Sequence, residues 1–200
     1  MNMEKKFELT DNFIINAFGV KLFQIKCTKS FKYAKEGDLG GYVEKDENLD
    51  QESDAWVSGN AWVSGDAWVS GDARVSGNAE VYGNAWVSGN AWVSGDARVS
   101  GNAEVSGDAR VSGNAEVSGN AEIDNNNKHC GFDCFGSANR HTHAYLTKEN
   151  KVEITCGCFR GSIEEFEKRV EETHSGTIYE KQYKAIIDVI KIKFGLTDLI

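Results

Sequence analysis

The chain has 200 residues and a formal net charge of −9, from 31 acidic and 22 basic side chains. This length is enough for one compact domain, or for a repeat array with small flanking units. No apolar run approaches the ~20 residues that a membrane span needs, and the N-terminus MNMEKKFELT lacks the hydrophobic region of a signal peptide. We therefore expect a soluble, cytoplasmic protein that makes no membrane contact.

The first 53 residues predict a small N-terminal β cap. Residues 7–28 alternate between apolar and polar side chains well enough to indicate two short strands. A Lys-rich connection then leads to the glycines of 37–41, which can supply positive φ or a close backbone approach where a coil begins. Val43 and Leu49 are six positions apart, so residues 1–53 also contain the first, irregular hexads.

Residues 54–124 carry a six-residue repeat, Ala-X-Val-Ser-Gly-Asn/Asp, which occurs twelve times between Ala55 and Ile123. In each unit Ala-X-Val is a short strand with Ala and Val on one face and X on the other, and Ser-Gly-Asn/Asp is a corner. Three units close a triangular coil, so the repeat predicts a parallel β-helix of about four coils. The aliphatic residue followed by a small one four positions later, as in Val57 and Ala61, resembles the left-handed β-helix of hexapeptide acyltransferases. The left-handed winding, an exception to the usual right-handed rule, rests on that resemblance.

Folding the repeat at every third unit places the outward X residues in three columns. The first column is Trp56, Arg74, Trp92 and Arg110; the second is Trp62, Glu80, Arg98 and Glu116; the third is Trp68, Trp86, Glu104 and Glu122. We expect guanidinium groups stacked on indoles in the first column, ion pairs in the second, and mild repulsion between the two glutamates of the third. A ladder that only keeps the strands in register would explain most of this pattern.

All five tryptophans face outward in this register, and that much exposed indole usually marks contact with another molecule. They could be covered by self-association into a dimer or trimer, by the N-terminal cap, or by a foreign protein partner. The segment 54–124 has ten acidic and three basic side chains, which argues against direct nucleic-acid binding by the repeat. An acidic surface could instead meet a basic protein surface, or serve only to keep the chain soluble.

Residues 125–200 predict an α+β domain that shields the open edge of the last coil, because unprotected β-helix ends would polymerise edge to edge. Ser162 and Glu165 form a capping box that opens a helix ending near His174. A second helix begins at about Ile178. The strand-like stretches lie around 132–137, 141–147 and 151–159.

A cluster of thiols and imidazoles in this domain is a candidate metal site. Four thiolates could surround zinc, with His129 or His141 as substitute ligands. The spacing is not a pair of CxxC motifs, so packed or incidental thiols are the alternative. A cysteine nucleophile would have no assigned base. The candidate ligands are Cys130, Cys134, Cys156 and Cys158.

The array lacks the features of an acyltransferase. Left-handed β-helix acyltransferases resemble one another in trimeric sites between neighbouring coils, with a histidine base and loops inserted from the coils. Residues 55–123 contain no histidine, no cysteine and no inserted loop, so a general base is absent where that family would place it. We expect neither enzymatic activity nor a cofactor.

The ends of the chain resemble hexapeptide-repeat proteins encoded by phages and prophages of Gram-positive and related bacteria, which are often labelled polymer-forming. The motifs that carry the resemblance are GDLGGYVE at 37–44, FGSANR at 135–140 and CGCF at 156–159. The resemblance supplies no catalytic residues, and it implies the cytoplasm of a bacterial host. Because small acidic phage proteins often block host antiviral machinery, we predict a non-enzymatic inhibitor of a defence component, such as a CRISPR effector or a nucleotide-signalling system. The alternatives are a self-associating assembly module of a phage and, less favoured, an acyltransferase.

Overall fold

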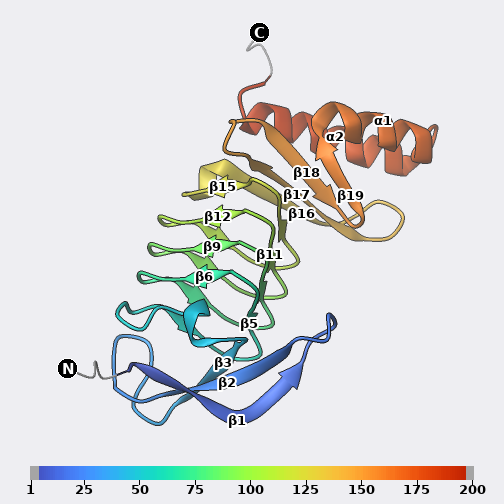
Figure 1. The fold of residues 1–200 in the computed structure, drawn as a ribbon. Helices are drawn as coiled ribbons and strands as arrows, with labels where there is room; N and C mark the ends of the chain where they lie inside the picture. Colours follow the sequence, from blue (N-terminus) through green and yellow to red (C-terminus); the bar gives the residue numbers. More distant parts are fainter. Residues whose placement is uncertain (1–4, 197–200) are drawn as a thin grey trace.

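A computed structural model describes residues 5–196 of the chain. An N-terminal hairpin, a stack of triangular coils and a C-terminal α+β domain follow one another along one axis (Figure 1). The predicted fold class, a mainly β solenoid with a helical C-terminal domain, is confirmed. Within residues 5–196 no helix is both long enough and apolar enough to cross a membrane.

The N-terminal cap continues one face of the solenoid. Strands β1 (Phe7–Ile15) and β2 (Lys21–Cys27) pair antiparallel, as the alternation of residues 7–28 predicts. Strand β3 (Leu39–Val43) then pairs antiparallel with β2 and parallel with the first coil. The close approach expected of the glycines is present: a Cβ on Gly41 would lie 2.5 Å from the carbonyl oxygen of Ala61.

Each hexad contributes one two-residue strand, and each strand of the first nine hexads pairs parallel with the strand three hexads later, as Trp56 does with Arg74. The inward Ala and Val side chains form a continuous buried core. The strands are β4 (Trp56–Val57), β5 (Trp62–Val63), β6 (Trp68–Val69), β7 (Arg74–Val75), β8 (Glu80–Val81), β9 (Trp86–Val87), β10 (Trp92–Val93), β11 (Arg98–Val99), β12 (Glu104–Val105), β13 (Arg110–Val111), β14 (Glu116–Val117) and β15 (Glu122–Ile123).

The solenoid has about five turns, one more than the twelve hexads predict. The sheet that starts with β1 runs through β2, β3, β5, β8, β11 and β14, so β3 is an extra parallel layer below the first hexads. Leu49, which follows the 3-10 helix η1 (Asp46–Asn48), forms a parallel bridge with Val69. The irregular hexads around Val43 and Leu49 therefore form a partial coil, and both side chains are buried in the common core. The left-handed winding stays a prediction.

The corners stack as regularly as the strands. The corner glycines adopt positive φ, which L side chains rarely adopt; Gly95 has φ +69°. Backbone bonds join successive corners, since the amide of Asn78 donates to the carbonyl oxygen of Gly95 over 2.8 Å. Side-chain amides form a second ladder at the same corner, where Asn60 donates to Asn78 over 3.2 Å and Asn78 to Asp96 over 2.9 Å. Successive corners of this column are therefore joined by both backbone and side-chain hydrogen bonds.

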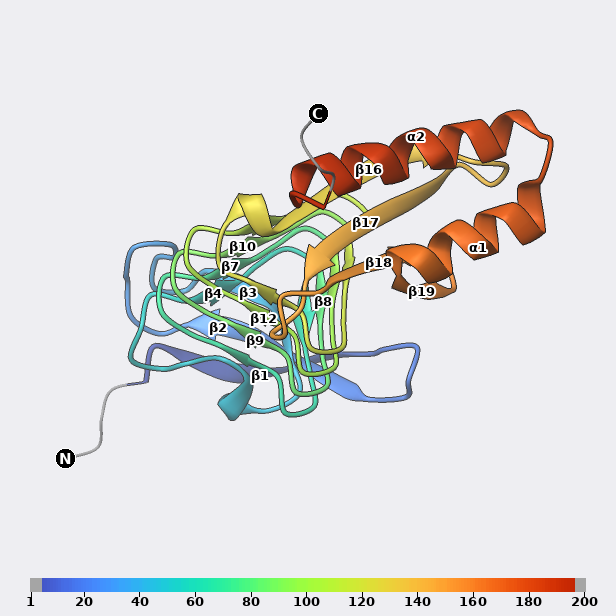
Figure 2. The ribbon, with the colours of Figure 1, turned by 90° about the horizontal axis from the view of Figure 1, so that it is seen from above.

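The C-terminal domain is an antiparallel sheet with two helices on the face that points away from the coils (Figure 1). Seen from above, the helices extend beyond the outline of the coils (Figure 2). The capping box is confirmed: the Glu165 amide donates to Ser162 Oγ, and the Ser162 amide donates to Glu165 Oε2. The predicted stretch 151–159 is divided by a turn. The elements are η2 (Asn126–Lys128), β16 (His129–Phe135), β17 (Arg140–Leu146), β18 (Val152–Cys156), β19 (Phe159–Ser162), α1 (Ile163–His174) and α2 (Ile178–Lys193).

Candidate functional site

The first predicted column is present in the predicted register, and it contains the expected stack of a guanidinium group on an indole. Trp56 pairs with Arg74, and Arg74 pairs with Trp92, which pairs in turn with Arg110. The guanidinium carbon of Arg74 lies 4.3 Å from the ring centroid of Trp92 and 5.2 Å from that of Tyr33. Such contacts contribute about 0.5–1 kcal/mol each when exposed. This column therefore supports the register of the coils.

The second column contains the expected ion pairs. Arg98 lies between two glutamates, 3.2 Å from Glu80 Oε2 and 3.5 Å from Glu116 Oε1. Because more than half of the Arg98 side chain is exposed, solvent screens both pairs and each contributes about 0–1 kcal/mol. This column also acts mainly as a register device.

Two of the five tryptophans do not lie at the surface, contrary to the expectation that all five are exposed. Trp56 is 5% exposed and Trp62 is 7% exposed. Phe31, from the connection after β2, packs edge-on against Trp56 with ring centroids 5.4 Å apart. Tyr82 stacks on Trp62 at 5.6 Å, and Phe18 from the β1–β2 turn packs on Tyr82 at 5.4 Å. The N-terminal cap therefore covers Trp56 directly, and it covers Trp62 together with Tyr82 of the second coil.

The exposed indoles lie together on the third column. Trp68 is 38% exposed and Trp86 is 44% exposed, and their ring centroids are 5.2 Å apart. Trp92, on the first column, is half-buried, and its indole N–H donates to Ser76 Oγ over 3.0 Å. We call the third column, which consists of Trp68, Trp86, Glu104 and Glu122, the Trp68–Trp86 face.

Lysines from the flanking segments neutralise part of the acidic array. The predicted repulsion between Glu104 and Glu122 is relieved, because each carboxylate has its own lysine partner. Four positive charges are thereby set against the seven net negative charges of residues 54–124. The pairs are Lys32 with Asp72, Lys45 with Asp66, Lys128 with Glu122, and Lys148 with Glu104.

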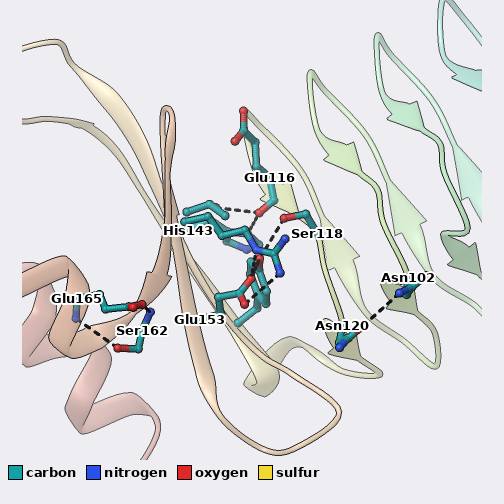
Figure 3. A network of polar contacts seen from close by, with 11 residues as sticks. Asn102, Glu116, Ser118, Asn120, His143, Glu153, Ser162 and Glu165 are labelled. Atoms are coloured by element: carbon teal, nitrogen blue, oxygen red, sulfur yellow. Dashed lines mark hydrogen bonds and ion pairs between the residues drawn. The ribbon is translucent and has the colours of Figure 1, made fainter. Parts of the chain in front are cut away.

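The junction between the last coil and the C-terminal sheet is a buried polar network (Figure 3). His143 Nδ1 lies 3.1 Å from the carbonyl oxygen of Glu116, and Thr155 Oγ1 donates to the same oxygen over 2.9 Å. Tyr145 is buried in the solenoid core, and its hydroxyl donates to Glu153 over 2.7 Å. This network holds the C-terminal domain on the open end of the coils.

Burial keeps the histidines of this junction neutral. His129 Nδ1 lies 3.0 Å from His143 Nε2. Burial lowers the pKa of His143 to about 3 and the pKa of His129 to about 4. One of these two facing nitrogens therefore donates a hydrogen bond to the other, and both imidazole rings are uncharged. Neutral, packed imidazoles in this position indicate a structural role.

The four candidate zinc ligands are not brought together. Cys130 on β16 and Cys156 on β18 have β17 between them and face different residues of it, so their backbones lie more than about 10 Å apart. Cys134 and Cys158 are exposed, Cys156 is buried, and burial raises the pKa of the half-buried Cys130 to about 11. Within residues 5–196, no group of three His, Cys, Asp or Glu side chains is arranged to hold a metal ion. A zinc site stays a prediction, which metal analysis of the purified protein would test.

The repeat is similar to a described repeat family. Residues 55–71, 73–89, 79–95 and 97–113 match the YdcK β-solenoid repeat. The match falls on the segment whose strands form three parallel ladders. The chain is a β-solenoid repeat protein. Comparison of this solenoid protein with curated proteins finds no match.

Several residues that shape the solenoid surface were not singled out from the sequence. Phe31 and Tyr33 contact the first column, and Lys128 and Lys148 pair with the third. The two aromatic residues lie within the Lys-rich connection before β3, and their presence there is the sequence feature that indicates a packed segment. A solvated loop would need no aromatic side chain. The lysine pairings had no comparable signal, because they depend on how the flanking segments fold back.

Proposed function

We propose that this solenoid is a non-enzymatic, phage-type binding protein that contacts a protein component of a bacterial antiviral defence system through its Trp68–Trp86 face. The observation that carries the proposal is the pair of adjacent, exposed indoles on the one column that keeps its tryptophans at the surface. Tryptophan is the residue most enriched at interface hot spots.

The surroundings of the two indoles suit an interface of moderate polarity. The ion pairs of Lys148 with Glu104 and of Lys128 with Glu122 continue the same column and provide a charged rim beside an aromatic centre. The sheet below is rigid, because hydrogen bonds join the four strands of the column into one parallel ladder. A rigid surface loses little conformational entropy when it binds.

The choice of a defence component rests on the resemblance to phage-encoded repeat proteins and on the acidic array. Effectors that bind nucleic acid do so through strongly basic channels. Asp96 and Asp108 form no ion pair within residues 5–196, so these corner carboxylates remain free to face a basic surface. The absence of a histidine from residues 55–123 supports a role in binding over acyl transfer.

The test is affinity capture from a bacterial lysate that contains defence nucleases, followed by calorimetry with the recovered partner. We compare the unaltered chain with a Trp68→Ala, Trp86→Ala double variant. Each hot-spot indole contributes about 2 kcal/mol or more, so the double variant should bind at least about 100-fold more weakly. Arg110→Ala is the matched control, since Arg110 is exposed on a different column. Equal binding by the double variant, or capture of no defence component, would refute the proposal.

Self-association is the second candidate function, and a further exposed apolar group favours it. Phe13 is 49% exposed and Phe18 64% exposed near the tip of the β1–β2 hairpin, in addition to the two indoles. Light scattering after size exclusion separates the two candidates. A stable homo-oligomer that the Trp68→Ala, Trp86→Ala variant disperses, with no partner in the lysate, would favour an assembly module.

A further inference from the structure

The C-terminal domain contains a cavity at some distance in the sequence from the solenoid columns. Its volume is about 290 Å³, and it opens between the sheet and the two helices. Residues of the β16–β17 turn, the β18–β19 turn and α1 surround the opening, among them Ser137, Cys158 and Thr173. The cavity belongs to a different domain from the Trp68–Trp86 face.

One stripe of α1 provides a wall of the cavity. The stripe has the spacing i, i+3, i+4, i+7, i+8, so all of its members lie on one side of the helix. Two of its members are apolar and buried, and the other three are polar and at least partly exposed. The members are Phe166, Arg169, Val170, Thr173 and His174.

The inner surface of the cavity is aromatic. Phe159 contacts Phe166 with ring centroids 5.0 Å apart, and Phe166 meets Tyr183 edge-on at 5.5 Å. His174 stacks on Tyr183 at 5.6 Å with an interplanar angle of 26°. Burial raises the pKa of Tyr183 to about 12, so its hydroxyl is protonated at neutral pH and can donate a hydrogen bond. Four rings in contact give the cavity an aromatic lining, which suits edge-to-face or offset contact with another planar ring.

The rim of the cavity carries two guanidinium groups that have no carboxylate partner in the described part of the chain. Arg140 and Arg169 line the opening from β17 and α1, and within residues 5–196 neither forms an ion pair. A Cβ on Gly157 would lie 2.5 Å from Arg140 Nη1, so this glycine, at φ +60°, makes room for the guanidinium to lie across the turn. The C-terminal end of α1 contributes roughly half a negative charge, which the two full positive charges exceed. The opening therefore favours an anion.

We infer that this cavity binds a small organic oxyanion, with a phosphate or carboxylate group between Arg140 and Arg169 and a planar ring against the aromatic wall. Guanidinium groups match both kinds of anion because their paired N–H donors suit two oxygens at once. The volume lies at the lower end of the range for small-molecule sites, which suits one ring and one anionic group better than a dinucleotide.

Calorimetric titration of the full-length chain with five matched probes tests this inference. Phenyl phosphate and benzoate combine a ring with an anion, inorganic phosphate and acetate lack the ring, and phenol lacks the charge. We expect a ring-bearing anion to bind with a dissociation constant on the order of 1 mM or tighter. It should bind at least tenfold more tightly than its ringless counterpart and than phenol. Preference for phenyl phosphate or for benzoate identifies the anion.

The Arg140→Gln, Arg169→Gln double variant should lose at least tenfold in affinity for that probe. Lys168→Gln is the control, because Lys168 is exposed on α1 and does not line the cavity. Both guanidinium groups are at the surface, and a thermal melt of each variant verifies that it folds.

A second readout comes from the thiols of the same chain. The bound probe should slow alkylation of Cys158, which lines the cavity, without slowing that of Cys134, which is exposed outside it. The inference is wrong if neither ring-bearing anion binds, if phenol binds equally well, or if the double variant keeps its affinity. None of these results bears on the Trp68–Trp86 face, so the two proposals fail separately.

Discussion

Replacing Gly95 with alanine should destabilise the solenoid more than the same replacement at Gly113. The two glycines have nearly the same backbone conformation, with φ +69° and +67°. A non-glycine residue in that conformation costs about 1–2 kcal/mol at either position. The positions differ in what a new Cβ meets. At Gly95 it would lie 2.9 Å from the backbone nitrogen of Gly113 in the next coil, whereas at Gly113 the nearest atom is Asp133 Oδ2, 4.0 Å away.

The additional loss at Gly95 measures how tightly the corners stack. A contact this short with backbone atoms forces a shift, and overpacking of this kind costs about 1–3 kcal/mol. We therefore expect a loss of about 1–2 kcal/mol for Gly113→Ala and about 2–5 kcal/mol for Gly95→Ala. Urea unfolding followed by circular dichroism gives both free energies of unfolding. Equal losses, or a larger loss at Gly113, would show that contact between corners does not limit the side chain at this position.

Two further predictions concern the junction and the tryptophans. An unfolded histidine titrates near pH 6.5, whereas folded His143 titrates at about 3. The unfolded state therefore takes up the proton first, and stability should fall as the pH drops below 6.5, by about 2 kcal/mol at pH 5 from this group alone. Urea unfolding at pH 7 and pH 5 measures the loss, which His143→Gln should reduce; an equal loss in this variant contradicts the assignment. Trp62→Ala should cost about 3–5 kcal/mol because the indole is buried, and Trp86→Ala less than about 1 kcal/mol because it is exposed; similar shifts in thermal melting would contradict the burial described for Trp62.

The coils could be predicted because their geometry is periodic. A repeat of six with Ala and Val on one face determines which residues lie inside, and a coil of three hexads determines which strands pair. The pairing of Trp92 with Arg74 and with Arg110 follows from that count alone. The partial coil was less evident, because the interval from Leu49 to Val57 departs from the period.

The solvent exposure of the columns could not be predicted in the same way. Trp62 and Trp86 occupy equivalent positions in their hexads, yet one is buried and the other exposed. The difference arises from Tyr82, which stacks on Trp62, and from Phe18 of the N-terminal cap, which packs on Tyr82 from 64 positions earlier in the sequence. The cavity of the C-terminal domain was likewise hidden, because Arg140 and Arg169 approach one opening only after the sheet and α1 have packed. Contacts of this kind depend on tertiary structure and leave no periodic signal.

Strands three hexads apart are neighbours in each ladder. The length of the solenoid can therefore change in discrete steps, by the addition or loss of hexads. Inserting three hexads would move the N-terminal hairpin and the C-terminal domain apart by one strand spacing, about 4.8 Å, and would preserve their relative orientation. Inserting a single hexad would instead rotate one end against the other by about a third of a turn, since each coil has three sides. Duplication of hexads can therefore change the distance and the angle between the N-terminal hairpin and the C-terminal domain, while the residues of each stay unchanged.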